Sequence, residues 1–290
     1  MRATRQGDAS ARREGALGLA LVLPPLLVLV FLIVLPAITA VVETLSPPAG
    51  AAGGPTFAHY AHVLGARIVR SDIIFSVEIA FVAVAVVMCL SYPLALYLRF
   101  AQGRLPAVCA VLFTIPLFVP VVIASFAMIT FLVNHGLIST VLYRLGFERF
   151  PPLVYNATGI VLTQVWASIP FAVLILGAGL QAIDDALIDG ARDVGAGRLR
   201  TFVSIILPLN VVPTMIALTL LFISIFGSFT IPYLVGGNAP QMLGVTMTNY
   251  LTQYFRRAEA VTMAVIAFVI AAAVGVIYVA SVSRRERGSL

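Results

Sequence analysis

The sequence predicts an all-α integral membrane protein with six transmembrane helices. Of its 290 residues, 61% are hydrophobic and only 10% are charged, whereas soluble domains carry about 25% charged residues. Long apolar runs recur between short polar segments, and each reaches the roughly 20 residues that a helix needs to cross a bilayer. With loops added, the length of the chain accommodates about six such helices.

The predicted spans follow the apolar runs in chain order. They are Ala16–Val42, Ile73–Leu98, Ala107–Val133, Ala157–Leu180, Pro208–Leu234 and Val261–Val282. The first run is longer than the roughly 7–15-residue core of a signal peptide, so we expect a retained helix. Every span except the last contains proline. Proline bends helices in lipid, which suits a protein that alternates between two openings.

The polar segments between these spans are expected to alternate between the two sides of the membrane. The predicted outer segments are Glu43–Asp72, Asn134–Asn156 and Val235–Ala258, and the predicted inner ones are Arg99–Pro106 and 181–207. Two short helices are expected in the outer segments, at Phe57–Val69 and Ile138–Leu145. Residues 1–15 and 283–290 are expected as tails that flank a transmembrane domain at 16–282.

The distribution of arginine predicts that both termini are cytoplasmic. All 18 basic residues are arginines, and twelve of them fall in the predicted inner segments and tails. The other six fall in the predicted outer segments. Positive residues favour the cytoplasmic side of a membrane, so orientation also explains the net charge of +6 without a nucleic-acid partner.

The segment Asp189–Pro208 is the most polar long interruption of the apolar sequence. Leu187, Gly190, Ala191 and Val194 recur with the spacing of one helical face. Gly195 and Gly197 are expected to end that helix, because glycine adopts left-handed dihedrals without penalty. A second short helix is expected at Arg198–Ile206. The small residues on the first helix would allow a partner protein to approach its backbone closely.

This segment resembles the cytoplasmic loop of permease subunits of bacterial binding-protein-dependent ABC importers. The family motif is Glu-Ala-Ala, three residues, Gly, nine residues and Ile-x-Leu-Pro. The chain matches the spacing throughout, with Asp in place of Glu and Gly in place of the first Ala. The matching residues are Asp189, Gly190, Ala191, Gly195, Ile205, Leu207 and Pro208. In hydropathy and loop order the resemblance extends from about Arg12 onward.

The resemblance implies the type I ABC importer permease fold in the bacterial inner membrane. It implies that the 181–207 loop forms a coupling helix that docks on an ATPase subunit. The expected partners are a second permease subunit in a heterodimer, two ATPase subunits and a periplasmic substrate-binding protein. ATP and Mg²⁺ are expected on the ATPase, so this chain would bind no cofactor and would not itself be an enzyme.

The end of the fifth span resembles the spermidine/putrescine branch of these permeases. The similarity lies in the Gly-Ser-Phe, Pro and Gly-Gly series of Gly227–Gly237, and it implies a polyamine or a related organic cation as substrate. Placing a carboxylate within the membrane costs roughly 2.5–3.5 kcal/mol, so Glu78 should face a polar or charged partner. A cationic substrate would be a suitable partner. The candidate residues of the substrate pathway are Glu78, Trp166, Asn210, Ser228 and Thr230.

Other functions remain as alternatives. An ion-coupled secondary transporter would act without an ATPase but needs ionisable residues in the membrane, and the spans offer little beyond Glu78. The same ABC role with a phosphonate, iron or a sulfate-like anion is also open, as is a homodimer. The sequence has no phosphate-binding G-x-x-x-x-G-K-[ST] motif and no H-E-x-x-H. His59 and His62 have no evident third ligand nearby, so no metal site is expected.

Overall fold

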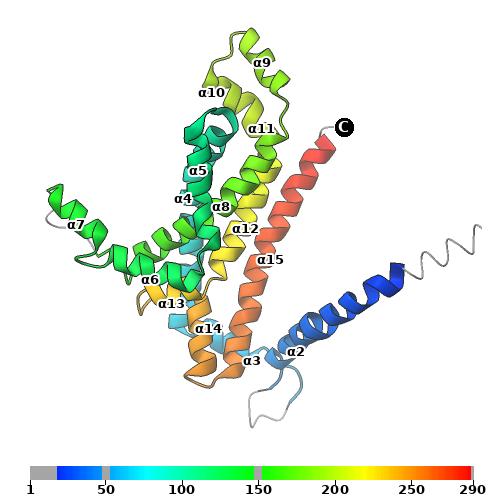
Figure 1. Ribbon diagram of the computed structural model, residues 1–290. Helices are drawn as coiled ribbons and strands as arrows, with labels where there is room; N and C mark the ends of the chain where they lie inside the picture. The colour runs from blue at the N-terminus through cyan, green and yellow to red at the C-terminus, as the bar shows by residue number, and fades with distance from the viewer. Residues whose placement is uncertain (1–17, 48–52, 147–151, 289–290) are drawn as a thin grey trace, which may run out of the picture.

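The computed structural model describes residues 18–47, 53–146 and 152–288. Throughout these ranges the chain forms helices joined by turns, with no strand (Figure 1). Five helical segments are long and apolar enough to cross a membrane, counting Val121–Arg144, which joins α6 (Val121–Leu132) and α7 (Leu137–Arg144), as one segment; one bent pair of helices makes a sixth when it is counted as a single span. The prediction of an all-α membrane protein is therefore confirmed, with five or six candidate spans in the described residues. The expected tail at 1–15 and the start of the first span lie outside the described residues.

The helices follow the predicted order. The first span is continuous over Gly18–Thr44 and includes a π-helical turn, Val30–Val34, followed by α2, Leu35–Thr44. The other helices are α3 (Ala58–Gly65), α4 (Arg67–Phe100), α5 (Arg104–Thr114), α6 (Val121–Leu132), α7 (Leu137–Arg144), α8 (Ala157–Gln181), α9 (Asp185–Asp193), α10 (Arg198–Thr201), α11 (Leu207–Leu209), α12 (Val211–Phe226), α13 (Thr230–Val235), α14 (Leu243–Thr252) and α15 (Arg257–Gly288).

The core lies where α4, α8, α12 and α15 run side by side. Ala80 and Ala83 of α4 are fully buried against Ala172 of α8 and Leu221 of α12. Small residues let membrane helices approach closely and gain van der Waals contact. Because these helices are nearly parallel, they define a long axis with α9 at one end and α14 at the other (Figure 1). We call these the α9 end and the α14 end.

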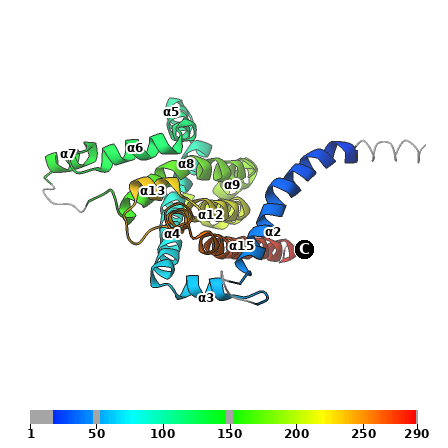
Figure 2. The same ribbon diagram turned by 90° about the horizontal axis from the view of Figure 1, so that it is seen from below.

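The first span stands apart from this core. It leans away from the other helices and contacts α15 only near its own C-terminus (Figures 1 and 2). Glu43 Oε1 lies 3.1 Å from Arg257 Nε there, and Thr44 Oγ1 lies 2.8 Å from the Tyr60 hydroxyl. These polar contacts fix the span at the α14 end and leave its apolar side chains exposed.

The third predicted span, Ala107–Val133, is not one helix, so this prediction was wrong. The chain leaves α5 through a short 3₁₀ helix, Ile115–Phe118, and is extended at Val119 and Pro120. Proline lacks an N–H and disfavours helical dihedrals at the residue before it. After the break α6 takes a new direction, and α7 extends away from the body of the molecule (Figure 2). The short helix expected at Ile138–Leu145 is confirmed as α7.

The fifth predicted span, Pro208–Leu234, is also broken. The helices before and after Asn210 form an angle of 69°, and α12 ends at Phe226 before the separate helix α13 begins. The sixth helix is longer than predicted, since α15 begins at Arg257 and continues through Gly288.

The predicted outer loop Val235–Ala258 contains α14, which is held against α4 by a carboxylate. Asp72 is only 3% exposed, and its Oδ1 accepts a hydrogen bond from the Gln241 backbone N–H at 3.0 Å. Its Oδ2 accepts one from Thr246 Oγ1 at 2.7 Å, and Ser76 Oγ accepts one from the Leu243 N–H at 2.7 Å. These contacts satisfy donors at the start of α14, where a helix leaves N–H groups unpaired.

We expect Asp72→Ala to lower the stability of the folded chain by about 1–3 kcal/mol, because it leaves the buried Thr246 hydroxyl and the half-buried Gln241 N–H without an acceptor. Thermal unfolding of the purified protein in detergent measures this effect. Ser71→Ala is the matched control, since Ser71 is exposed on the same turn of α4. Equal unfolding temperatures for the two variants would contradict the proposed role of Asp72.

Candidate coupling site

The predicted helix near Asp189 is present as α9, and its two ends are capped. Asp184 begins the helix and accepts a hydrogen bond from the Ala186 N–H at 2.9 Å. At the other end Gly195 has a φ of +83°, in the left-handed region that glycine adopts readily. The N–H groups of Gly195 and Ala196 bond to the carbonyls of Arg192 and Ala191 at 2.9 Å, which is the Schellman arrangement. The expected helix stop at Gly195 is confirmed.

The face predicted from helical spacing points away from the rest of the chain. Leu187 is 51% exposed and Val194 is 84% exposed. Nothing lies within 4 Å of the position where Gly190 would carry a Cβ atom. The one buried residue of α9 is Ile188, which packs against the bundle instead. Helix α9 therefore presents an open face of small and apolar residues at the end of the molecule.

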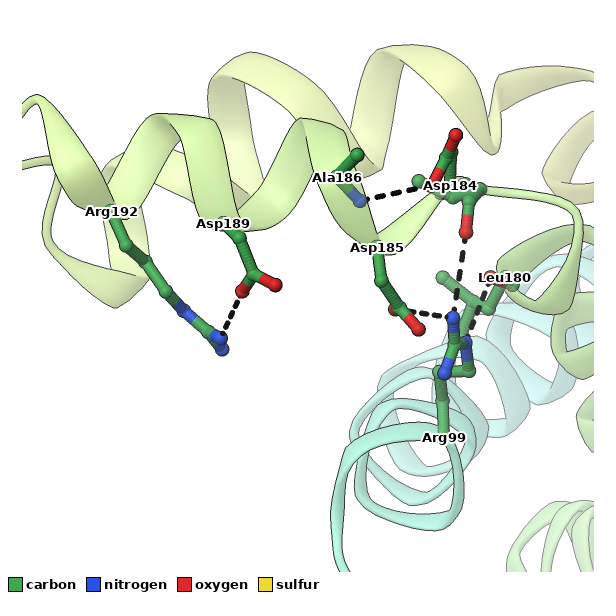
Figure 3. A network of polar contacts seen from close by, with 8 residues as sticks. Arg99, Leu180, Asp184, Asp185, Ala186, Asp189 and Arg192 are labelled. Carbon is green, nitrogen blue, oxygen red and sulfur yellow. Dashed lines mark hydrogen bonds and ion pairs between the residues drawn. The ribbon is translucent and has the colours of Figure 1, made fainter.

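Arg99 joins this helix to two long helices of the core (Figure 3). Its Nε donates to the Leu180 carbonyl at 3.2 Å, and its Nη2 donates to the Ile183 carbonyl at 3.4 Å. Nη2 also lies 2.6 Å from Asp185 Oδ1. The arginine thus connects the end of α4, the last turn of α8, the turn that follows α8 and the first residue of α9. By contrast, Arg192 and Asp189 form an exposed pair at 3.0 Å within α9.

We expect Arg99→Gln to weaken the attachment of α9 to the bundle. The neutral amide of glutamine cannot replace the three charge-assisted contacts that the Arg99 guanidinium makes. Amide hydrogen exchange should rise across 182–194 and stay unchanged in α12. Arg104→Gln provides the control, because Arg104 is exposed at the start of α5. Unchanged exchange across 182–194 in the Arg99 variant would contradict this anchoring role.

The second half of the motif forms a bent connection to α12. A π-helical turn, Phe202–Ile206, leads into α11, which contains Leu207 and Pro208. Ile206 is buried in the core, whereas Ile205 is half-buried and Leu207 is 37% exposed. The residue between the two motif positions therefore makes the main packing contact.

Asn210 occupies the bend and is completely buried. Its Nδ2 donates to the Tyr92 hydroxyl at 3.3 Å, and its carbonyl accepts from Thr214 Oγ1 at 2.6 Å. On the α8 side, a Cβ atom on Gly179 would lie 2.0 Å from Asn210 Oδ1. Asn210 therefore lies buried at the contact between α4, α8 and α12.

The other pathway candidates lie on different elements. Glu78 is exposed on α4, and Trp166 is half-buried on α8. Ser228 and Thr230 are half-buried at the break between α12 and α13. Their role in a pathway stays a prediction. Sequence reasoning missed Arg99 and Asp72 as structural residues, since their partners lie 81 to 174 positions away along the chain.

Comparison with known proteins decides the family. Residues 90–288 match the model of the binding-protein-dependent transport system inner membrane component. The chain belongs to this family. It is a permease subunit of the ABC importer type and a multi-pass protein of the inner membrane, as the motif led us to expect.

Individual relatives differ in the substrates that their names give. The spermidine/putrescine transport permease PotB of Escherichia coli (strain K12) is 25% identical over 199 residues, covering 67% of this chain and 72% of PotB. The sulfoquinovosyl glycerol permease SmoG of Agrobacterium fabrum is 35% identical over 123 residues, covering 41% and 40% of the two chains. A bacterial ABC transporter that imports alginate has the same fold, with a TM-score of 0.79 at 18% identity over 95% of this chain and 98% of that one.

Proposed function

We propose that this permease subunit imports a polyamine or a related small organic cation, with α9 as the helix that receives the ATPase. It would pair with a second permease subunit, with two ATPase subunits at the α9 end and a periplasmic binding protein at the α14 end. Both termini would then be cytoplasmic. ATP and Mg²⁺ would bind on the ATPase, which leaves this chain to change the accessibility of the pathway.

The exposed face of α9 is the observation on which the coupling role depends. Exposed apolar side chains such as Leu187 and Val194 gain about 25 cal/mol per Å² when a partner buries them. Gly190 and Ala191 lie between Leu187 and Val194 on the helix, and they are small enough to let a partner surface approach the backbone closely. The helix is also anchored by Arg99, so a force on α9 reaches α4 and α8 directly.

The bend at Asn210 supports the second part of the mechanism. Movement of α9 also reaches α12 through α10, the π-helical turn and α11. The 69° bend between these helices converts displacement at the α9 end into a tilt of α12. Bent helices of this kind are tolerated in membrane proteins where neighbouring groups satisfy the freed backbone groups.

The cationic substrate is supported by the similarity to the spermidine/putrescine permeases and by the exposed carboxylate of Glu78 on α4. The second candidate is a sulfonated glycoside, which the higher identity of the 123-residue match to the sulfoquinovosyl glycerol permease favours.

An uptake measurement distinguishes these two substrates. The chain, reconstituted in vesicles with its ATPase, second permease and binding protein, is expected to accumulate labelled spermidine when ATP is present. ATP-dependent uptake of sulfoquinovosyl glycerol and none of spermidine would exclude the polyamine assignment.

Glu78→Gln should raise the concentration of spermidine needed for half-maximal uptake by a few-fold, because an accessible ion pair contributes up to about 1 kcal/mol. Glu78→Asp keeps the charge and is the matched control, which should remain close to the unmodified protein. The concentration dependence of uptake measures the difference. Identical curves for both variants would remove Glu78 from the pathway and leave the coupling role untouched.

A further inference from the structure

A cavity of about 570 Å³ lies beneath the tip formed by α9 and α10, next to the end of α4. Leu96, Tyr97, Phe100 and Phe202 form an apolar wall, and Arg192 and Arg198 add two positive charges to the lining. We propose that this cavity binds an anionic phospholipid of the inner leaflet, with its phosphate at the arginines and an acyl chain on the apolar wall. This inference rests on the cytoplasmic placement of α9 in the proposed function.

The charges of the cavity are available to a ligand. Arg198 forms no ion pair with any residue that the structure describes. Arg192 pairs with Asp189, but both side chains are more than 60% exposed, and exposed pairs of this kind contribute at most about 1 kcal/mol. Guanidinium groups present a planar fork of donors that matches a phosphate. Two arginines at one cavity therefore favour a phosphate-bearing ligand.

The apolar wall argues for a lipid over a soluble anion. Tyr97 and Phe100 lie in the last turn of a membrane-spanning helix, at the level where aromatic residues meet lipid headgroups. A free phosphate would use the arginines and leave the wall in contact with water, whereas a phospholipid covers both. Basic residues near the inner leaflet attract anionic lipids by about 1 kcal/mol each.

The cavity lies among the elements that would transmit force from the ATPase, so a bound lipid would affect coupling. Its lining joins α4 to α9, α10 and the π-helical turn, which are the elements that would transmit force from the ATPase. A bound lipid would fill the space between the rigid core and this tip. We therefore expect coupled transport to depend on anionic lipid, while assembly with the ATPase does not.

The test uses the complete complex in two kinds of vesicle, phosphatidylcholine alone and phosphatidylcholine mixed with phosphatidylglycerol. Native mass spectrometry of the extracted complex counts retained phosphatidylglycerol, and ATP-driven uptake is measured in parallel. Arg192→Gln and Arg198→Gln should each lower retention about fivefold, because each removes one of the two cavity cations that would face the phosphate, at about 1 kcal/mol per cation. Ala196→Trp should lower it without a change of charge, because Ala196 lines the cavity.

Arg200→Gln is the matched control, since Arg200 is exposed on α10 and does not line the cavity. Equal loss of phosphatidylglycerol in the Arg200 and Arg198 variants would show a general surface attraction and overturn the site. Displacement of the lipid by inorganic phosphate alone would assign the cavity to a soluble anion instead. A complex that binds its ATPase and transports equally in both vesicles, with no retained lipid, would refute this inference and leave the proposed function standing.

Discussion

Val194→Glu is expected to reduce co-purification of the ATPase subunit by an order of magnitude or more and to abolish ATP-driven uptake. Val194 is 84% exposed at the end of α9, so the change should not disturb the fold of the chain itself. In a docked complex the same side chain would lie against the partner. An unpaired charge is costly to bury at an apolar contact, and loss of a single hot-spot contact already costs about 2 kcal/mol or more; about 1.4 kcal/mol corresponds to a tenfold change in affinity.

Leu251→Glu is the control for that experiment. Leu251 is 49% exposed on α14, so it offers a comparable apolar-to-acidic change at the opposite end of the molecule. Yield and thermal unfolding should be the same for both variants, and ATPase binding should fall only for Val194→Glu. Retention of the ATPase by a well-folded Val194 variant would exclude this face of α9 as the docking surface.

Gly179→Leu is expected to have the largest effect on the folded chain. A Cβ atom at this position would lie 2.0 Å from Asn210 Oδ1 and 2.3 Å from Pro213 Cγ, which is closer than any real contact. Overpacking of a dense interior costs about 1–3 kcal/mol, and here the neighbours are a buried amide and a rigid proline ring. Thermal unfolding in detergent should shift strongly downward, and Gly179→Ala should shift it in the same direction by less.

Gly177 provides the comparison within the same helix. No atom lies within 4 Å of its ideal Cβ position, and alanine is a better helix former than glycine by about 1 kcal/mol. Gly177→Ala should therefore leave the unfolding temperature unchanged or raise it. Equal unfolding temperatures for the alanine variants at 177 and 179 would show that close packing of α8 against the Asn210 bend does not stabilise the folded chain.

The local features of α9 were predictable because they depend on residues close together in the chain. Glycine at 195 permits the left-handed turn that ends the helix, and Leu187 and Val194 fall on one face through helical spacing alone. The same reasoning did not identify Ile188 as the residue that packs against the bundle, since that depends on where α8 and α4 lie. The motif predicted the helix and its stop, and the packing of the bundle set its orientation.

Proline content alone did not locate the breaks in the spans. Pro93 and Pro170 lie inside the continuous helices α4 and α8, whereas the chain breaks at Pro120 and bends at Asn210. Whether a proline ends a helix depends on the neighbours that satisfy the freed carbonyl, and those neighbours come from other parts of the fold. The bend at Asn210 needs Tyr92 and Gly179, which belong to two other helices.

Apolar run length and one spaced motif predicted an ABC importer permease with helical spans and a capped helix in one loop, and the family match over residues 90–288 confirms the permease. These signals are local, because a bilayer requires about 20 apolar residues in a row and a helix end requires its own cap. The anchoring of α9 by Arg99, the attachment of α14 by Asp72 and the cavity beneath the α9 tip arise only from packing. Each joins residues that are distant in the chain, and their polar groups find partners only after the helices have assembled.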